Sequence, residues 1–322
     1  MSNGKLNYLS YLIPLVLLSV VFTSIDFGEL ELAFSEVDLL VAIFAFSAYL
    51  AIIPIITIRW KVLIGMVCDN SPTYREALVD HWSGMAIGWV TPSNLGWDAF
   101  RAVSMSRRVG APRKQVTVII LEKIMTLFVC IFLVILLFSV FGISDDMSTT
   151  IYVEKVLIPI MAVLIFSALI IKSRAYPIIV NIITNLEKRF FAKWFEDFTE
   201  GDRVRTHIGQ ISFFLPAIIT SLPLFILAII DLVLIRSMGA EISILETTFA
   251  VSILAVIFAM PISFGSLGVR EGSYILIYSE LGLTNEQALA LSIINLGGII
   301  LNSSVGAIIS KKSWTNHISM GK

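Results

Sequence analysis

A short polar segment between apolar stretches, residues 91–101, carries side chains that suit the binding of an anion. Pro92 ends the incoming apolar stretch, and Gly96 permits a tight turn or a close approach of the backbone. Asn94, or the turn itself, would leave backbone N–H groups free at the start of the next helix, where anions bind favourably. Arg101 follows about one helical turn later and suits a bidentate contact with a phosphate. The segment predicts recognition of a phosphate-bearing group; a plain turn with an interfacial arginine is the alternative.

Residues 260–272 repeat this order of features later in the chain. Pro261 precedes a run of small residues that ends at Gly268. Arg270 and Glu271 follow after one further residue, and we predict that they either guard the mouth of a second site or pair with each other. Together the two turns would offer a phosphate-binding site that is reachable from either side of a membrane.

Ionisable and polar side chains also lie inside long apolar stretches. Glu122 and Lys123 come near the start of one stretch, whereas Asp231 and Asn295 lie deep in two others. Such groups are costly in hydrocarbon, so they face a cavity or a partner. Glu122 is equally consistent with a structural ion pair, and Lys123 with a side chain that extends to the interface. The full set of candidate binding residues is Arg59, Asn94, Gly96, Asp98, Arg101, Glu122, Lys123, Asp231, Gly268, Arg270, Glu271 and Asn295.

The overall composition places these residues in a membrane protein. Of the 322 residues, 57% are hydrophobic and 15% are charged, and the mean hydropathy is +0.89. Soluble domains have about 45–50% apolar and about 25% charged residues. This difference excludes a soluble domain, a disordered chain, and a nucleic-acid-binding protein that acts through a basic surface. Two cysteines and three scattered histidines predict neither a disulfide framework nor a metal site, and no cofactor is expected.

Six apolar segments have the roughly 20 residues that a helix needs to cross a bilayer. Two pairs of shorter segments, 78–90 with 97–108 and 247–260 with 273–283, predict re-entrant helical hairpins. The alternative for each pair is a full span followed by a surface helix, and 247–260 is the better candidate to span. We therefore predict an all-α polytopic membrane protein with six spanning helices and two re-entrant hairpins. The predicted spans are residues 6–24, 38–58, 116–141, 151–171, 211–235 and 286–309.

The distribution of charge predicts how the chain is oriented. Most of the 23 Lys and Arg lie in residues 59–114 and 172–205, whereas residues 25–37 contain acids and no base. The positive-inside rule then places both termini in the cytoplasm and the acidic loops outside. We treat residues 1–322 as one domain of the cytoplasmic membrane.

The two polar turns belong to an internal repeat. Aligning the two Leu-Gly turns also brings Arg59 onto Asp231. The first copy, residues 38–141, begins outside, and the second, residues 211–309, begins inside. This inverted arrangement is typical of secondary transporters; a duplicated scaffold without transport is the alternative. Between the copies, residues 175–206 are amphipathic and predict a helix in the headgroup plane or a solvated connector.

Three stretches resemble the motifs of a known family. Residues 90–101, the charged pair at the start of the following span, and residues 261–272 are similar to the flippase-like family named after the transmembrane region of lysylphosphatidylglycerol synthase. The last stretch is the most specific, because its run Gly-Ser-Leu-Gly-Val-Arg-Glu-Gly fits that family's second turn. The chain departs from the pattern at Asp98, one position from the usual acid, and at Lys123 and Thr126, which replace an arginine and an aspartate.

This resemblance implies movement of a lipid between membrane leaflets. In bifunctional relatives the region moves an aminoacylated phospholipid that a separate soluble domain makes, and other relatives are linked to polyprenyl-phosphate sugars or hopanoids. The sequence contains no such domain, so we expect neither lipid synthesis nor other enzyme activity. The expected partners are a membrane lipid (an anionic phospholipid, an aminoacyl-phospholipid or a polyprenyl phosphate), a separate lipid-modifying enzyme and a second copy of the chain, but no nucleic acid.

The resulting hypothesis assigns a role to each turn. Arg101 and its turn receive the headgroup from the inner leaflet, and the turn at Gly268 releases it outside. Glu122 and Asp231 line the polar path, and one of them carries a proton. Replacing Arg101 by alanine is expected to abolish lipid movement and to leave the fold intact. The alternatives are a glycosyl- or headgroup transferase that uses the outer-loop acids at 145–146, and a scaffold that positions a partner synthase.

Overall fold

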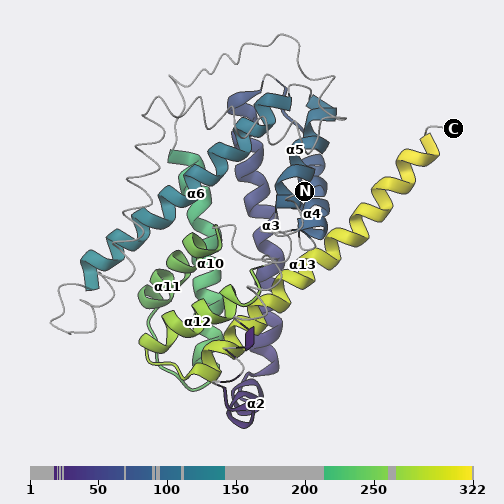
Figure 1. Ribbon diagram of the computed structural model, residues 1–322. Helices are drawn as coiled ribbons and strands as arrows, with labels where there is room; N and C mark the ends of the chain where they lie inside the picture. The colour runs from purple at the N-terminus through teal and green to yellow at the C-terminus, as the bar shows by residue number, and fades with distance from the viewer. Residues whose placement is uncertain are drawn as a thin grey trace, which may run out of the picture. The chain divides into compact units, whose positions relative to one another are not determined.

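The computed structural model consists of packed helices, with no strand among the residues that it describes (Figure 1). The described residues are 18–19, 21, 23, 25–68, 70–88, 91, 95–109, 112–141, 214–259 and 266–320. All but the end of α6 belong to one compact unit made of residues 1–137 and 206–322. The helices are α2 (Phe27–Ser35), α3 (Leu39–Val67), α4 (Tyr74–Gly88), α5 (Leu95–Val109), α6 (Pro112–Phe141), α10 (Phe214–Ser237), α11 (Ile244–Phe258), α12 (Val269–Glu280) and α13 (Asn285–Met320).

Helices α3, α6, α10 and α13 are long and apolar enough to cross a membrane. They coincide with four of the predicted spans, so the all-α, multi-pass architecture is confirmed at this level. The predicted span at 151–171 lies outside the described residues, as do most of 6–24 and all of the connector at 175–206.

Helix α3 continues past the predicted end of its span, residue 58, to Val67. The charge pattern assigned Arg59 to the following polar stretch, but Arg59 lies within the helix and is buried. A helix keeps its hydrogen-bonding pattern across a charged residue, provided that the charge finds a partner inside the protein. Arg59 has such a partner on α6, described below.

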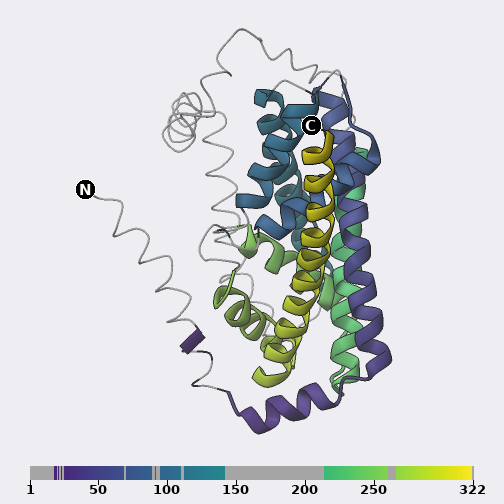
Figure 2. The ribbon, with the colours of Figure 1, turned by 90° about the vertical axis from the view of Figure 1, so that its right-hand side faces the viewer.

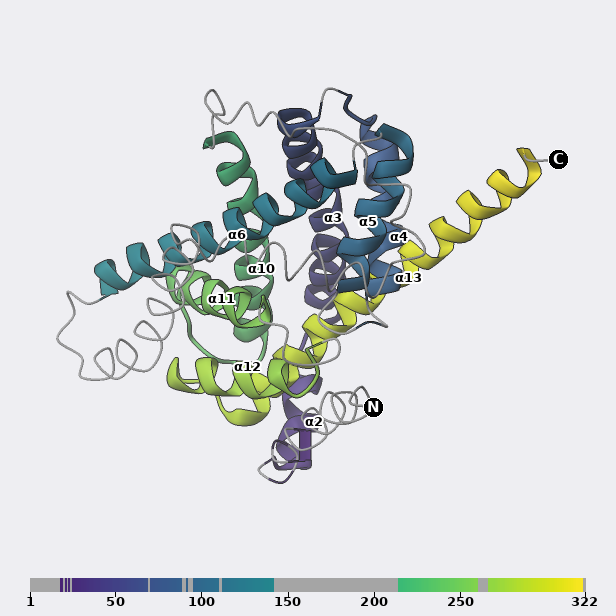
Figure 3. The same ribbon diagram turned by 45° about the horizontal axis from the view of Figure 1, so that its top comes forward.

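Helices α4 and α5 form an antiparallel pair (Figure 3). Arg108 near the end of α5 lies 3.5 Å from Glu76 in the first turn of α4, so the chain returns to the end at which it entered. The two helices approach closely at Gly88, where an added Cβ would lie only 2.7 Å from the Cβ of Trp97. Each helix has 15 residues, and such a helix is about 22 Å long, shorter than the roughly 30 Å hydrocarbon core. The geometry is that of the predicted hairpin, whose entry into the membrane stays a prediction.

Helices α11 and α12 form the second pair of short helices. Phe258 at the end of α11 stacks on Tyr274 of α12, with 6.4 Å between the ring centroids. The turn that precedes α12 contains two residues with a positive φ angle, in keeping with the tight turn predicted from its glycine. Gly268 has a φ of 76° and Ser266 a φ of 61°. Glycine adopts this left-handed region without the steric cost that a Cβ imposes.

Three loops meet at one end of the described bundle. The side-chain amide of Gln287 donates to the carbonyl of Met238 at 2.8 Å, which joins the start of α13 to the end of α10. The backbone N–H of Asp26 donates to Glu286 at 3.2 Å, and α2, which begins there, packs against α13 and leads into the start of α3 (Figure 2). The sequence assigned all three loops to the same, outer side.

Helix α13 packs closely against both α3 and α4. A Cβ at Gly306 would lie 1.9 Å from the carbonyl oxygen of Trp82. One turn earlier, the side-chain amide of Asn302 donates to the carbonyl of Tyr49 at 3.0 Å. Helix α13 therefore links the first repeat to the second.

Candidate functional site

Charged side chains from α3, α5 and α6 meet in the interior of the first repeat. Glu122 lies at the centre and accepts hydrogen bonds from two arginines: Arg59 Nη2 donates to its Oε1, and Arg101 Nη1 donates to its Oε2 at 2.9 Å. The Glu122 and Arg101 side chains are only 5% and 1% exposed. We call Arg59, His81, Asp98, Arg101 and Glu122 the arginine–glutamate cluster. Burying charges in this way is tolerated because each has an opposite charge within hydrogen-bond distance.

Arg101 is fully buried, and its guanidinium contacts acidic, histidine and tryptophan side chains. Its Nη2 donates to Asp98 Oδ1 at 2.6 Å, and its Nη1 lies 3.0 Å from His81 Nε2. The guanidinium carbon lies 5.1 Å from the ring centroid of Trp60 and 5.0 Å from that of Trp97, within the range of a cation–π contact. The sequence predicted that Arg101 holds a phosphate; in this structure two carboxylates hold the guanidinium.

A line of ion pairs connects this cluster with the surface of the bundle. Lys123 Nζ lies 2.9 Å from Asp98 Oδ2, and Asp98 in turn holds Arg101. Exposure falls along this line from 52% for the Lys123 side chain to 13% for Asp98 and 1% for Arg101. Lys123 is therefore exposed and also forms a specific ion pair with Asp98.

The turn at Gly96 has one of the two features predicted for it, a close approach of the backbone, but not a free N–H group. A Cβ at Gly96 would lie 2.5 Å from Thr91 Oγ1, so the close backbone approach predicted there is present. The N–H of Gly96 is not free for an anion, since it donates to Thr91 Oγ1 at 2.9 Å. Asn94 lies outside the described residues.

A second buried polar group occupies the interior of the second repeat. Asp231 on α10 accepts hydrogen bonds from the hydroxyl of Tyr278 at 2.5 Å and from Asn295 Nδ2 at 2.8 Å. Asn295 Nδ2 also donates to the hydroxyl of Tyr274 at 2.8 Å, and its Oδ1 accepts a hydrogen bond from Tyr49. These five buried residues from α3, α10, α12 and α13 form what we call the aspartate–tyrosine cluster.

Arg270 and Glu271 are both buried at the start of α12. Glu271 accepts the N–H of Gly268 at 2.6 Å and so caps its own helix. The Arg270 guanidinium lies 5.9 Å from the ring centroid of Phe258. Neither side chain lines an exposed mouth in this structure.

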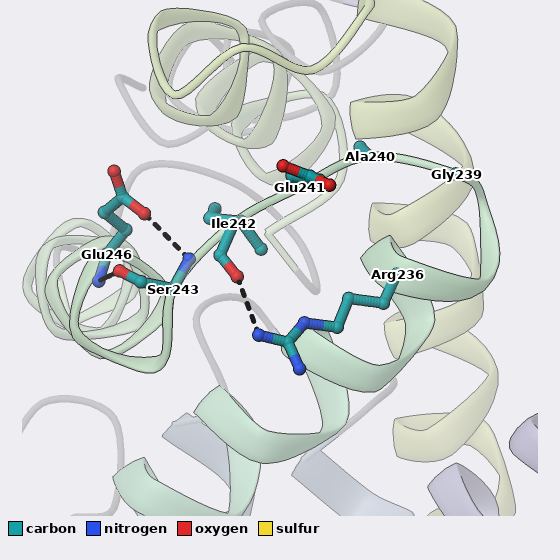
Figure 4. Close-up of a pocket in the computed structure, with 7 residues that line it drawn as sticks. All are labelled: Arg236, Gly239, Ala240, Glu241, Ile242, Ser243 and Glu246. Atoms are coloured by element: carbon teal, nitrogen blue, oxygen red, sulfur yellow. Dashed lines mark hydrogen bonds between the residues drawn. The ribbon is translucent and has the colours of Figure 1, made fainter.

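Two surface hollows lie away from both clusters, at the end of α10. One, about 610 Å³, is bounded by the loop between α10 and α11, where Arg236 Nη2 reaches toward the carbonyl of Ile242 at 3.4 Å (Figure 4). On its far side Ser243 and Glu246 cap α11 through reciprocal hydrogen bonds. The other, about 520 Å³, includes Glu36 and also touches Arg236. The charged side chains of the clusters do not line either hollow.

Several residues of these clusters were not selected from the sequence. Tyr49, Tyr274 and Tyr278 count as apolar in a hydropathy profile, although each has a hydroxyl that needs a partner when buried. Their spacing was informative, since Tyr274 and Tyr278 stand four residues apart on one helical face. His81 was visible as an ionisable residue in an apolar stretch. The acids at 145–146, required by the transferase alternative, lie outside the described residues.

The comparisons with known proteins agree with the motifs. The chain matches the family described as the lysylphosphatidylglycerol synthase TM region over residues 7–295. This match covers both clusters and confirms the resemblance seen in the sequence. No curated protein and no solved structure matches the chain significantly.

Proposed function

We propose, on the premise that the chain belongs to the lysylphosphatidylglycerol synthase transmembrane-region family, that it moves a lipid with a charged or phosphate-bearing headgroup between the leaflets of the cytoplasmic membrane. The proposal assigns it no catalytic step and places both termini in the cytoplasm. The observation that carries it is the arginine–glutamate cluster, a set of buried ion pairs that joins the membrane-length helices α3 and α6 to the short helix α5. Ionisable groups at such positions are costly and mark the paths of polar cargo.

The cluster supports an exchange of ligands at Arg101. A phosphate presents acceptor oxygens with the same sign of charge as the two carboxylate oxygens that hold the guanidinium now. Asp98 has a second cation, Lys123, already at 2.9 Å. When a phosphate replaces Asp98 at Arg101, Asp98 keeps that partner, so the exchange leaves no buried acid unpaired.

The exposure of these residues defines the order in which a headgroup meets them. Lys123, 52% exposed, is the first cation, and Arg101 is the innermost. The acyl chains remain in the bilayer while the headgroup follows polar groups, which avoids the cost of a bare charge in hydrocarbon. Release is assigned to the turn at Gly268 beside Arg270, because an inverted repeat presents the corresponding element to the opposite leaflet.

Mass spectrometry of the lipids that co-purify with the protein tests this function. The informative variant is Lys123→Gln, which removes the outermost cation of the line without leaving a buried charge. Lys61→Gln is the matched control, because Lys61 on α3 makes none of the cluster's contacts. We expect one class of anionic or sugar-phosphate lipid to be enriched in the wild type and in Lys61→Gln, and to fall several-fold in Lys123→Gln. Equal lipid profiles in all three proteins would contradict the proposed entry site.

A further inference from the structure

We propose that the aspartate–tyrosine cluster is a proton-binding site, with Asp231 as the acceptor, and that its occupancy controls the lipid movement. The coupling part rests on the proposed function, whereas the proton site itself does not. The inference starts from a buried acid that the headgroup pathway leaves without a role.

Asp231 differs from Glu122, the buried acid of the first repeat, in its partners. Within the described part of the chain its carboxylate is hydrogen-bonded by Tyr278 and Asn295, both neutral, while Glu122 is bonded by two arginines. Asp231 is only 1% exposed. An anion buried with neutral donors alone retains a large desolvation cost, and taking up a proton removes that cost.

The groups around this carboxylate favour a proton over a metal ion. The described residues contain no group of three or more His, Cys, Asp or Glu side chains that would hold a metal. The two carboxylate oxygens already have donors at 2.5 and 2.8 Å, so a metal ion would have to displace them. A proton needs no such space.

The other elements packed around the carboxylate contribute few charges. Helix α11, which packs against α10, carries one acid, Glu246, and it is engaged in capping with Ser243. The titratable or charged groups that face the cluster from the remaining helices are Tyr49 of α3 and Arg270, Tyr274 and Tyr278 of α12.

Protonation would change the hydrogen bonds that join three helices. The proton comes from hydronium in the aqueous phase, which leaves a neutral water molecule, and it adds to Asp231 Oδ2, which becomes a donor toward the oxygen of Tyr278. Tyr278 keeps its own hydroxyl hydrogen and must turn it toward another acceptor. Asn295 connects the same carboxylate to Tyr49 and Tyr274, so α3, α12 and α13 all respond to the charge of one side chain.

This response reaches the element assigned to headgroup release. Tyr274 and Tyr278 lie on α12, which begins at the turn containing Gly268. A change in how the two tyrosines hold α12 therefore changes how that turn is held. The site couples the charge at Asp231 to the second turn, at a distance from the arginine–glutamate cluster.

Infrared spectroscopy of the purified full chain in lipid tests the proton site directly. We expect a carboxylic-acid C=O band that weakens as the buffer is changed from acidic to alkaline. It should disappear in Asp231→Asn, shift in Tyr278→Phe, and persist in Glu29→Gln, which removes an exposed acid of α2. Identical spectra for the wild type and Asp231→Asn would overturn the proton site. Tyr278→Phe keeps the test valid even where Asp231→Asn folds poorly.

Vesicles that contain the protein and a fluorescent phosphatidylglycerol test the coupling. The wild type is expected to change its rate of lipid movement several-fold when a pH difference is imposed, and Asp231→Asn to move the lipid at a rate independent of that difference. Lipid movement in both proteins without any response to pH would overturn the coupling and leave the proposed function standing. No lipid movement in the presence of a titrating band would overturn the proposed function and leave the proton site standing. A response to Na⁺ at constant pH would overturn the assignment of the proton.

Discussion

The two repeats place polar residues at corresponding positions but neutralise them differently. Where the first repeat has Arg59, the second has Asp231, and both are buried in membrane-length helices. The first repeat balances its acid, Glu122, with two arginines on neighbouring helices. The second surrounds its acid with hydroxyl and amide groups. One scaffold has thus produced a centre held by ion pairs and an acid whose hydrogen-bond donors are neutral.

This difference separates two tasks within one fold. In the function proposed above, ion pairs hold the first centre closed, and a competing anion opens it by taking over a partner. An acid that has only neutral donors responds instead to a proton, since protonation removes the charge that the protein leaves unbalanced. We assign the headgroup to the first centre and the control of its movement to the second.

The largest effect is expected from removing the central acid of the first repeat. Glu122→Ala leaves Arg59 and Arg101 without their shared partner, and breaking a buried pair in this way costs about 3–5 kcal/mol. Arg101→Ala should destabilise the protein less than Glu122→Ala, because Glu122 keeps Arg59 and Asp98 keeps Lys123 when the buried guanidinium is removed. The size of this loss tests the sequence-based expectation that the fold of Arg101→Ala stays intact. Thermal unfolding in detergent measures both variants, and wild-type stability in either would contradict the cluster geometry.

The two hairpins should respond with opposite sign to the same substitution. In α4, Gly88→Ala places a Cβ 2.7 Å from the Cβ of Trp97, and such overpacking costs about 1–3 kcal/mol. In α12, Gly272 has no heavy atom within 4 Å of an added Cβ, so Gly272→Ala should stabilise the helix by up to about 1 kcal/mol. Unfolding curves of the pair provide the check, and an equal loss in both would show that the hairpins pack alike.

A smaller effect is expected at the acid of the second repeat. Asp231→Asn keeps the shape and removes the uncompensated charge, so the free energy of unfolding should change by less than about 1 kcal/mol or rise. Glu122→Gln, the matching amide substitution in the first repeat, should destabilise clearly more. The comparison is made by unfolding both variants in the same near-neutral buffer. If Asp231→Asn lowered the free energy of unfolding more than Glu122→Gln, the charge of Asp231 would have to be stabilised by the surrounding protein.

The smallest effect on stability is expected at the surface end of the ion-pair line. Lys123 is 52% exposed, and exposed pairs contribute about 0–1 kcal/mol. Lys123→Gln should therefore unfold close to the wild type while losing co-purified lipid. A large loss of stability would show that Lys123 has a structural role, and would contradict its assignment to the entry path.

Hydropathy predicted the spanning helices well but could not supply the side-chain partners. The segment around Asp231 was long and apolar enough to identify, whereas α12 begins at Val269, four residues before the predicted start at residue 273. The end of α3 was placed too early because a profile treats Arg59 as a solvated charge, whereas Glu122 neutralises it from another helix. Which helices are neighbours decides such pairs, and that depends on packing. For the same reason, the sequence could not predict that two carboxylates hold Arg101 in the interior.

The most direct test of lipid movement is a reconstituted assay. Vesicles containing the protein and fluorescent phosphatidylglycerol are treated with a reductant that cannot cross the membrane. The account predicts that wild-type and Lys61→Gln proteins expose the label of both leaflets to the reductant, and that Lys123→Gln does so several-fold more slowly. Quenching limited to the outer leaflet in the wild type, as in protein-free vesicles, would contradict it.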